Sequence, residues 1–199
     1  MELRDGYFDV PAGKVAAVVT YLDRALRDLS PVTSAPEGVR LCEVSKPDPD
    51  AYRRLFRRVG SEWLWASRLA LSPSDLAKAL SAPGVVLFVL ECDGHEAGVL
   101  ELKFDAESAC EIAFFGLSRQ AMGRGLGRWL MAQAFVRAVE GGAKRVWLHT
   151  CTLDSPGALG FYRKMGFRPY KRSVEVFDDP RLRGLLPAEA APQIPLIGG

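Results

Sequence analysis

The sequence lacks a net charge of any size, since 26 lysines and arginines stand against 24 aspartates and glutamates. A balance this even gives no electrostatic reason to expect general binding to nucleic acid. Long hydrophobic runs are missing too, and none approaches the roughly 20 residues that a helix needs to span a bilayer. The opening residues, MELRDGYFDV, lack the basic and then apolar order of a secretory leader. We therefore expect a soluble, cytoplasmic protein that binds neither nucleic acid nor membranes.

Cysteine is scarce and scattered. Its four positions, Cys42, Cys92, Cys110 and Cys151, form no C-x-x-C pair. Isolated cysteines of this kind are typical of small buried residues in a reducing compartment, so we expect neither disulfides nor a metal site. Hydrophobic residues, in contrast, make up 48% of the 199 residues. That share is enough for the core of one domain with appendages.

The N-terminal region is predicted to be helical. Between residues 11 and 28, a proline suited to a first turn precedes apolar residues at helical spacing, namely Val15, Val18, Val19, Leu22 and Leu26. The stretch SPVTSAPEG, residues 30–38, is rich in turn formers. We expect residues 1–38 to form a helical extension and a linker.

Residues 39–178 show alternating strand and helix patterns. Strands are predicted at 39–44, 85–92, 97–104, 109–117, 145–153 and 167–178. Helices are predicted at 48–59, 72–84, 125–140 and 155–166, with Ser72 as an N-cap. Short turns join the three strands from 85 to 117, so these strands should be antiparallel neighbours. The order predicts one mixed α/β (α+β) domain, followed by a loose proline-rich tail over residues 179–199.

Three glycines, Gly123, Gly125 and Gly127, stand at the start of the helix predicted at 125–140. Glycine is costly in a helix, and a chain that accepts this cost usually needs its backbone close to another group. A P-loop does not fit, because Gly-Lys-Ser/Thr is missing, and a dinucleotide fingerprint does not fit, because Arg128 replaces its third glycine. What remains is a row of backbone N–H groups at a helix N-terminus, which attracts phosphate. The nearby cationic residues are Arg119, Arg124 and Arg128.

The stretch around these glycines resembles a known family. The residues QAMGRGLG match the Q/R-x-x-G-x-G/A signature of the GNAT N-acetyltransferase superfamily through Gln120, Gly123 and Gly125. The preceding EIAFFGL is similar to the family's fourth strand, and ALGFYRKMGFRPY is similar to its fourth helix with the ending Y-x-x-x-GF. The resemblance covers residues 39–178. It implies the GNAT fold, in which a mixed, mostly antiparallel central sheet is flanked by helices and splayed between strands four and five.

The resemblance implies that acetyl-CoA binds where those two strands part, without a metal. Its pyrophosphate would lie on the turn at 120–125, and its pantetheine arm would follow the edge of the fourth strand. The residues thus assigned to acetyl-CoA are Phe115, Leu117, Gln120, Ala121, Met122, Gly123, Arg124, Gly125 and Ser155. At Ser155 many relatives have asparagine, so this serine either contacts the cofactor or caps the following helix.

Acetyl transfer to an amine needs a base for the ammonium proton and a donor for the departing thiolate. The resemblance implies that Tyr162 is the donor and that Glu111 is the base, which often acts through water. Glu101, on the preceding strand, is the alternative base. Each of these residues also has a structural interpretation, Tyr162 in core packing and Glu111 as a solvated or ion-paired strand residue. His149 is interpreted as structural.

Residues 52–71 correspond to the segment that walls the acceptor site in this family. Trp63 and Trp65 are either core residues or part of that wall, and alternation along an extended segment lets one of them line the cavity. Four arginines form a solvated helix face or recruit an acidic acceptor: Arg53, Arg54, Arg57 and Arg58. An aromatic wall favours a small aromatic or aliphatic amine over a polycation.

The predicted function is transfer of an acetyl group from acetyl-CoA to a primary amine of a small molecule, peptide or protein. The alternative is an inactive acyl-CoA-binding sensor or interaction module with the same fold. The presence of both Tyr162 and Glu111 favours the enzyme. A homodimer is compatible with the sequence.

Overall fold

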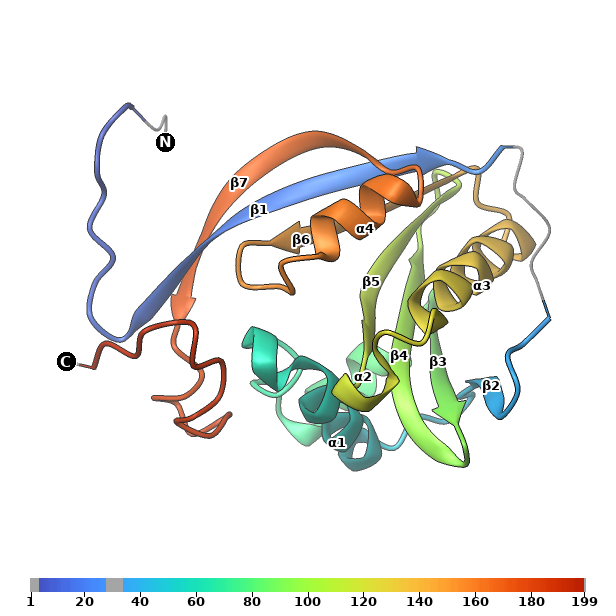
Figure 1. The fold of residues 1–199 in the computed structure, drawn as a ribbon, viewed down its shortest axis with the longest axis horizontal. Helices are drawn as coiled ribbons and strands as arrows, with labels where there is room; N and C mark the ends of the chain where they lie inside the picture. The colour runs from blue at the N-terminus through green and yellow to red at the C-terminus, as the bar shows by residue number, and fades with distance from the viewer. Residues whose placement is uncertain (1–3, 28–33, 199) are drawn as a thin grey trace.

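The computed structural model describes residues 4–27 and 34–198, which form a seven-stranded sheet in the order β2-β3-β4-β5-β6-β1-β7 (Figure 1). The strands are β1 (Lys14–Ala25), β2 (Val39–Glu43), β3 (Val85–Cys92), β4 (His95–Phe104), β5 (Ala109–Leu117), β6 (Arg145–Cys151) and β7 (Arg168–Asp178). Neighbouring strands are antiparallel except β5 and β6, which are parallel. The mixed α/β class predicted from the sequence is confirmed.

Four α-helices of the described chain begin and end at recognisable signals. They are α1 (Pro49–Gly60), α2 (Pro73–Leu80), α3 (Leu126–Glu140) and α4 (Ala158–Lys164), with short 3-10 helices η1 (Ser61–Trp63) and η2 (Arg119–Ala121). The Ser72 hydroxyl accepts a hydrogen bond of 3.1 Å from the backbone N–H of Asp75, so the predicted N-cap is confirmed. All four helices lie within or close to their predicted ranges.

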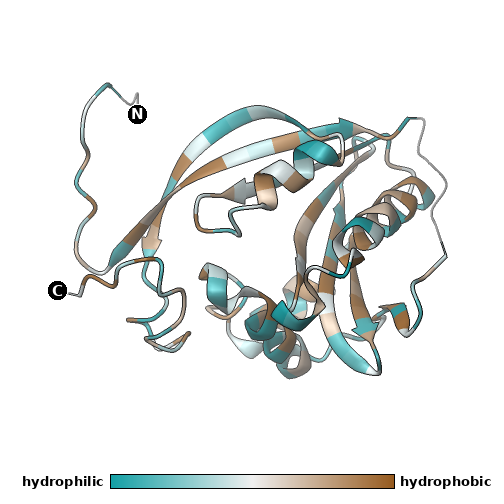
Figure 2. Ribbon diagram, in the orientation of Figure 1, coloured by the Kyte–Doolittle hydropathy of each residue, from teal (hydrophilic) through white to brown (hydrophobic). Residues whose placement is uncertain are grey.

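Two hydrophobic clusters cover the two faces of the sheet. Adjacent residues of one strand fall into different clusters, as alternation requires: Leu87 packs with α1 and α2, whereas Phe88 packs with α3 and α4. We call these the α1-side and α3-side clusters. In Figure 2 the central strands β4 and β5 are coloured mainly as hydrophobic, whereas β7 is mixed. The centre of the sheet is therefore buried on both faces.

The helix predicted at 11–28 is wrong over its described part, because residues 14–25 form strand β1. This strand buries one face at its start and the opposite face at its end. Val15 and Ala17 belong to the α1-side cluster, whereas Leu22 belongs to the α3-side cluster. This switch of face places Val15, Val19, Leu22 and Leu26 at spacings of four, three and four, which imitates a helical face.

The strand β1 lies between β6 and β7, so it is part of the same sheet as residues 39–178. Val19 pairs with Cys151 of β6 on one side and with Ser173 of β7 on the other. The predicted helical extension is therefore corrected to a strand of the domain. Residue 28 and residues 30–33 of the predicted linker lie outside the described residues.

The predicted loose tail is also wrong for residues 179–198. Asp179 and Arg181 form a buried ion pair of 2.6 Å, with side chains 3% and 2% exposed. The remaining guanidinium N–H groups of Arg181 donate to backbone carbonyls further along the segment, including those of Ala190 and Ile194. Leu186 packs in the α1-side cluster. The C-terminal segment is thus held against the domain beside the start of β1 (Figure 1).

Candidate functional site

The strands β5 and β6 pair over three residue pairs, which end at Glu111 and Trp147, and no further pairing is found among the described residues. A β-bulge in β5 follows at once. Glu101 of β4 faces Phe114, but the next residue, Leu102, faces Ile112, which leaves Ala113 as the extra residue. A bulge bends its strand and strengthens its twist, so β5 turns away from β6 at this point.

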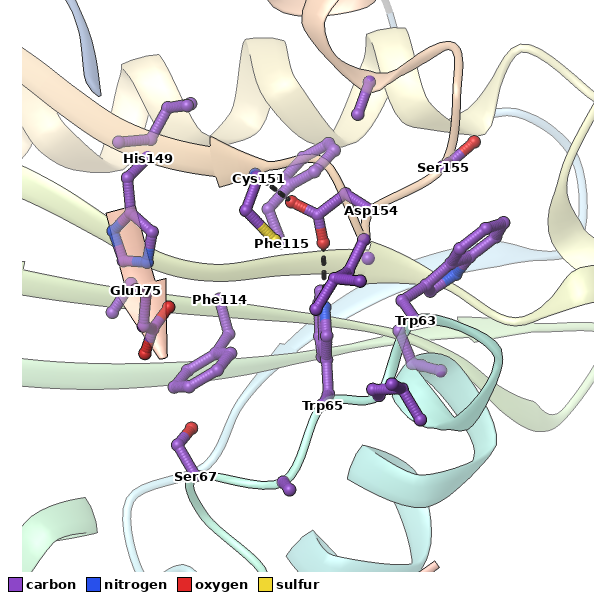
Figure 3. A pocket seen from close by; sticks show the side chains of 18 of the residues that line it. Trp63, Trp65, Ser67, Phe114, Phe115, His149, Cys151, Asp154, Ser155 and Glu175 are labelled. Atoms are coloured by element: carbon purple, nitrogen blue, oxygen red, sulfur yellow. Dashed lines mark hydrogen bonds between the residues drawn. The ribbon is translucent and has the colours of Figure 1, made fainter. Parts of the chain in front are cut away.

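A cavity of about 820 Å³ opens where the two strands part. Figure 3 shows its walls: Phe114 and Phe115 come from β5, His149 and Cys151 from β6, and Trp63 and Trp65 from the segment after α1. Both tryptophans line the cavity, whereas the sequence left open whether they belong to the core or the wall and allowed one of them to line it. The volume lies within the range of small-molecule sites.

Tyr162 of α4 lines this cavity and is held by an aromatic group. Its ring lies edge-on to those of Phe115, Phe161 and Phe167, with ring centroids 6.2, 5.5 and 6.1 Å away. Its hydroxyl has no hydrogen-bonding partner among the residues that the structure describes. Burial, and secondly the charge of Asp154, raises the pKa of Tyr162. The hydroxyl is therefore a protonated donor that the chain itself leaves unused.

The glycine turn lies at one end of the cavity. Gly123 and Gly125 have φ angles of +76° and +78°, which L side chains rarely adopt, and a Cβ on either would meet nothing within 4 Å. Gly125 is the N-cap of α3. Glycine is therefore needed here for the backbone conformation, and the space above it is open to a ligand.

The predicted acetyl-CoA residues divide into two groups. Phe115, Leu117, Met122 and Ser155 line the cavity. The others form the turn at its edge without lining it: Gln120, Ala121, Gly123, Arg124 and Gly125. The N-cap of α4 is Gly157 with no side-chain cap, so Ser155 does not cap this helix and its hydroxyl is left for a ligand.

Two arginines of the turn are tied to neighbouring loops. Arg124 donates to Cys92 Sγ at 2.9 Å and lies 3.4 Å from Asp93. Arg119 donates to Glu62 at 2.8 Å. These pairs are exposed and weak, so both side chains can turn to an anionic ligand at little cost.

The carboxylate of Glu101, the alternative base, already interacts with two side chains. It is fully buried, accepts a 2.7 Å hydrogen bond from the Tyr52 hydroxyl and pairs with Arg68. Burial and the Glu101 charge raise the pKa of Tyr52, which keeps that hydroxyl protonated. A carboxylate so held fastens α1 to the sheet, and Glu101 is not among the described residues that line the cavity.

Glu111 is half-buried on β5 at the point where the strands part, and burial raises its pKa. The charge of His149 acts in the opposite direction on this pKa, so the two groups are close. His149 lines the cavity, whereas Glu111 is not among its described lining residues. His149, which sequence reasoning interpreted as structural, is therefore the residue of this pair that faces the cavity.

Sequence reasoning also missed Asp154 and Glu175. Asp154 accepts hydrogen bonds from Trp65 Nε1, Thr150 Oγ1 and the backbone N–H of Cys151, at 3.1, 2.7 and 3.0 Å, and so joins the loop after α1 to the loop after β6 (Figure 3). Glu175 of β7 lines the cavity. Glu175 is an exposed residue between two exposed valines, Val174 and Val176, and no sequence signal marked it.

Within the described ranges, no group of three or more His, Cys, Asp or Glu side chains is placed to hold a metal ion. The four cysteines are free thiols. No described helix is both long enough and apolar enough to cross a membrane.

Comparison with known families decides the family. The model of the acetyltransferase (GNAT) family matches residues 49–167, which is more than half of the chain. The chain belongs to the GNAT acetyltransferase family. This confirms the resemblance, the GNAT fold and the enzyme class, an N-acetyltransferase, that the sequence predicted.

Individual relatives of this GNAT protein are distant. The Escherichia coli (strain K12) protein YjgM, described as an uncharacterized N-acetyltransferase, is 26% identical over 141 residues, which are 67% of this chain and 84% of YjgM. A GCN5-related N-acetyltransferase from Sphaerobacter thermophilus has a TM-score of 0.64 and 19% identity over 82% of this chain. An acetyltransferase from Thermus thermophilus has a TM-score of 0.54 and 20% identity, with 70% of this chain and 96% of that chain covered. This chain spans about half, 52%, of the Sphaerobacter chain.

Proposed function

We propose that this protein transfers the acetyl group of acetyl-CoA to a primary amine by direct attack of the amine on the thioester. The observation that carries the proposal is the unpartnered Tyr162 hydroxyl in the cavity between β5 and β6, beside an open glycine turn. Family membership implies the acetyl donor. The acceptor is a small molecule, peptide or protein.

The donor site is built from a free strand edge and a helix N-terminus. Among the described residues, β5 has no strand partner on the β6 side after Glu111, so its backbone there offers hydrogen bonds to the amides of a pantetheine arm. Phe115 and Leu117 lie on this part of β5. The pyrophosphate would bind the backbone N–H groups from Gln120 to Gly125 at the start of α3.

The chemistry needs two proton movements. Glu111 takes one proton from the acceptor ammonium through water. The neutral amine then attacks the thioester carbon, the C–S bond breaks, and the thiolate leaves with the electron pair. Tyr162 donates a hydrogen bond to the sulfur as this charge develops. The nitrogen, which is cationic after its attack, loses a second proton, and the thiolate takes it up.

The proposed function is tested with acetyl-CoA and a panel of amines, with release of free thiol as the readout. We expect turnover with at least one amine and an acetyl-CoA-dependent rise in melting temperature, because a ligand that binds only the folded state stabilises it. NADH serves as the control and should shift the melting temperature much less. Binding of acetyl-CoA without turnover of any amine would favour the sensor, and an equal shift with NADH would refute the donor site.

Replacement of Gly125 with valine should weaken acetyl-CoA binding by about tenfold or more, equivalent to at least one lost hydrogen bond to a charged group. The branched side chain would occupy the open space above the turn. Titration calorimetry on the folded variant measures the affinity. Gly142→Val is a matched control, since Gly142 has a φ of +83°, also has open space around it, and lies beyond the far end of α3. Equal affinities of the two variants would show that Gly125 serves only the turn.

A further inference from the structure

The cavity is unequally charged. Beside the glycine turn lie Arg119, Arg124 and Arg128, of which Arg119 pairs with Glu62 and Arg124 with Asp93. At the other end, β7 lines the cavity with the carboxylates of Glu175 and Asp178, and a third carboxylate, that of Asp154, lies next to Ser155. The first end suits phosphates, and the second suits a cation.

These three carboxylates differ in how their charge is balanced. Asp178 lies 2.6 Å from Lys14 and 2.7 Å from Arg183, so its charge is compensated. Asp154 accepts hydrogen bonds only from neutral donors among the described residues. Glu175 has neither a hydrogen-bonding partner nor an ion pair within the part of the chain that the structure describes. Two negative charges in the cavity are therefore uncompensated.

Glu175 is placed to meet the acceptor. It pairs with Ala17 of β1, and its strand neighbour two residues on, Phe177, packs in the α1-side cluster. Both side chains thus lie on the face that closes the cavity. Figure 3 shows Glu175 and His149 on the same side of the view as Phe114, and all three residues line the cavity.

The rest of this end is largely apolar. Trp65, Phe114 and Phe177 supply aromatic surface, and the C-terminal segment adds Pro180 and Leu185. The guanidinium of Arg183 also lines the cavity but is paired with Asp178, with its side chain 62% exposed. Arg183 is the one lysine or arginine among the described lining residues, and turning it towards an acidic group would leave the charge of Asp178 with Lys14 alone.

We infer that the acceptor is a small amine with an apolar or aromatic body and no carboxylate beside the amine, and that Glu175 binds its ammonium group. This inference rests on the proposed function and narrows its acceptor. A carboxylate on the acceptor would lie close to the uncompensated charge of Glu175, whose side chain is exposed. Like charges near a solvated surface repel enough to lower binding by about tenfold.

The test compares amines with their carboxylated counterparts: phenethylamine with L-phenylalanine, and isopentylamine with L-leucine. L-Phenylalaninamide separates the bulk of the added group from its charge. Values of kcat/KM are compared per free amine, because the amine pKa differs within each set. Wild-type protein should prefer the amine without a carboxylate by at least about tenfold, with the amide close to that amine.

Glu175→Gln should raise the KM for phenethylamine by about tenfold and narrow the preference over L-phenylalanine, with unchanged acetyl-CoA affinity. Glu43→Gln is the matched control, because Glu43 is an exposed residue of β2 at the opposite edge of the sheet. It should leave both acceptor and donor constants unchanged.

The failures of the two proposals are distinguishable. If no amine of any kind is acetylated, the proposed function itself fails. Two outcomes overturn the acceptor class while the proposed function stands. In the first, the protein prefers L-phenylalanine and L-leucine to the amines without a carboxylate. In the second, it acetylates other amines but no compound of either pair. An unchanged KM for phenethylamine in Glu175→Gln overturns the role of Glu175.

Discussion

Tyr162→Phe should lower kcat by about 10²–10⁴-fold, the usual effect of losing a proton-donating group, and should leave acetyl-CoA affinity nearly unchanged. The phenylalanine ring keeps the edge-on packing against Phe115, Phe161 and Phe167, so the fold is retained. Only the hydroxyl is lost, and the described chain gives it no other partner. Steady-state kinetics with the best acceptor, together with calorimetry for acetyl-CoA, measure the two effects. Full kcat in this variant would reduce Tyr162 to a packing residue.

The pH dependence of the reaction rate distinguishes the defect of Tyr162→Phe from that of Glu111→Gln, the variant of the proposed base. Because the pKa of Tyr162 is raised, its hydroxyl stays protonated over the working range, and the defect of Tyr162→Phe should be the same at every pH. The defect of Glu111→Gln should shrink as pH rises, because more of the acceptor is then neutral. Burial raises the pKa of Glu111, so the acid limb of the wild-type profile should lie above the ordinary range of a glutamate. A pH-independent Glu111→Gln defect would transfer the base role to His149 or to water.

Arg68→Ala should lower the free energy of unfolding by about 3–5 kcal/mol, the typical cost of breaking a buried ion pair from one side. Glu101 is fully buried, and without Arg68 its charge keeps only the Tyr52 hydroxyl as a partner. Urea denaturation followed by tryptophan fluorescence measures the loss. The acceptor KM should rise as well, because the Arg68 guanidinium lies over the ring of Phe114, 5.2 Å from its centroid, and Phe114 lines the cavity.

The double variant Arg68→Ala with Glu101→Gln is the control for this effect. The neutral amide keeps the shape of Glu101 and still accepts from Tyr52, so most of the lost stability should return. A deficit that is equal in the single and double variants would show that the cost is one of lost packing and not of an unpaired charge.

Local signals predicted most of the elements because those elements follow local rules. The strands β3, β4 and β5 are joined by short turns and carry apolar runs, and each was found within two residues of its predicted start. The helix α2 begins at a serine followed by a proline, and α3 begins at a glycine turn. In each case the deciding information lies within a few residues of the element.

Where the prediction failed, the deciding contacts are distant in sequence. In β1 the buried face changes because its two ends meet different helices, and no local pattern reveals such a change. The C-terminal segment looked loose because of its prolines, yet the buried Arg181 gathers its carbonyls and pairs with Asp179. A single arginine among prolines carries no recognisable sign of burial.

The residues of the site divide in the same way, into those that a local motif predicts and those whose role depends on distant contacts. The family motif led to Tyr162 and to the glycine turn, because these residues are read from a contiguous pattern. Glu175 and Asp154 were missed because their meaning depends on which strands and loops face the cavity. The hydrogen bond of Glu101 with Tyr52 and its ion pair with Arg68 could not be predicted either, since 49 and 33 residues separate these partners from Glu101.

The position of β1 between β6 and β7 also has a consequence for how the chain reaches its native state. Val18 bonds to Thr152, 134 residues later, and Lys14 bonds to Asp178, 164 residues later. Contacts between residues this far apart in the sequence form slowly, and during synthesis β1 emerges long before β6 and β7. The hairpins of β3, β4 and β5 can form as soon as they are made. The part of the cavity wall that β6, β1 and β7 supply can therefore assemble only after β7 has been made, when the hairpins of β3, β4 and β5 are already in place.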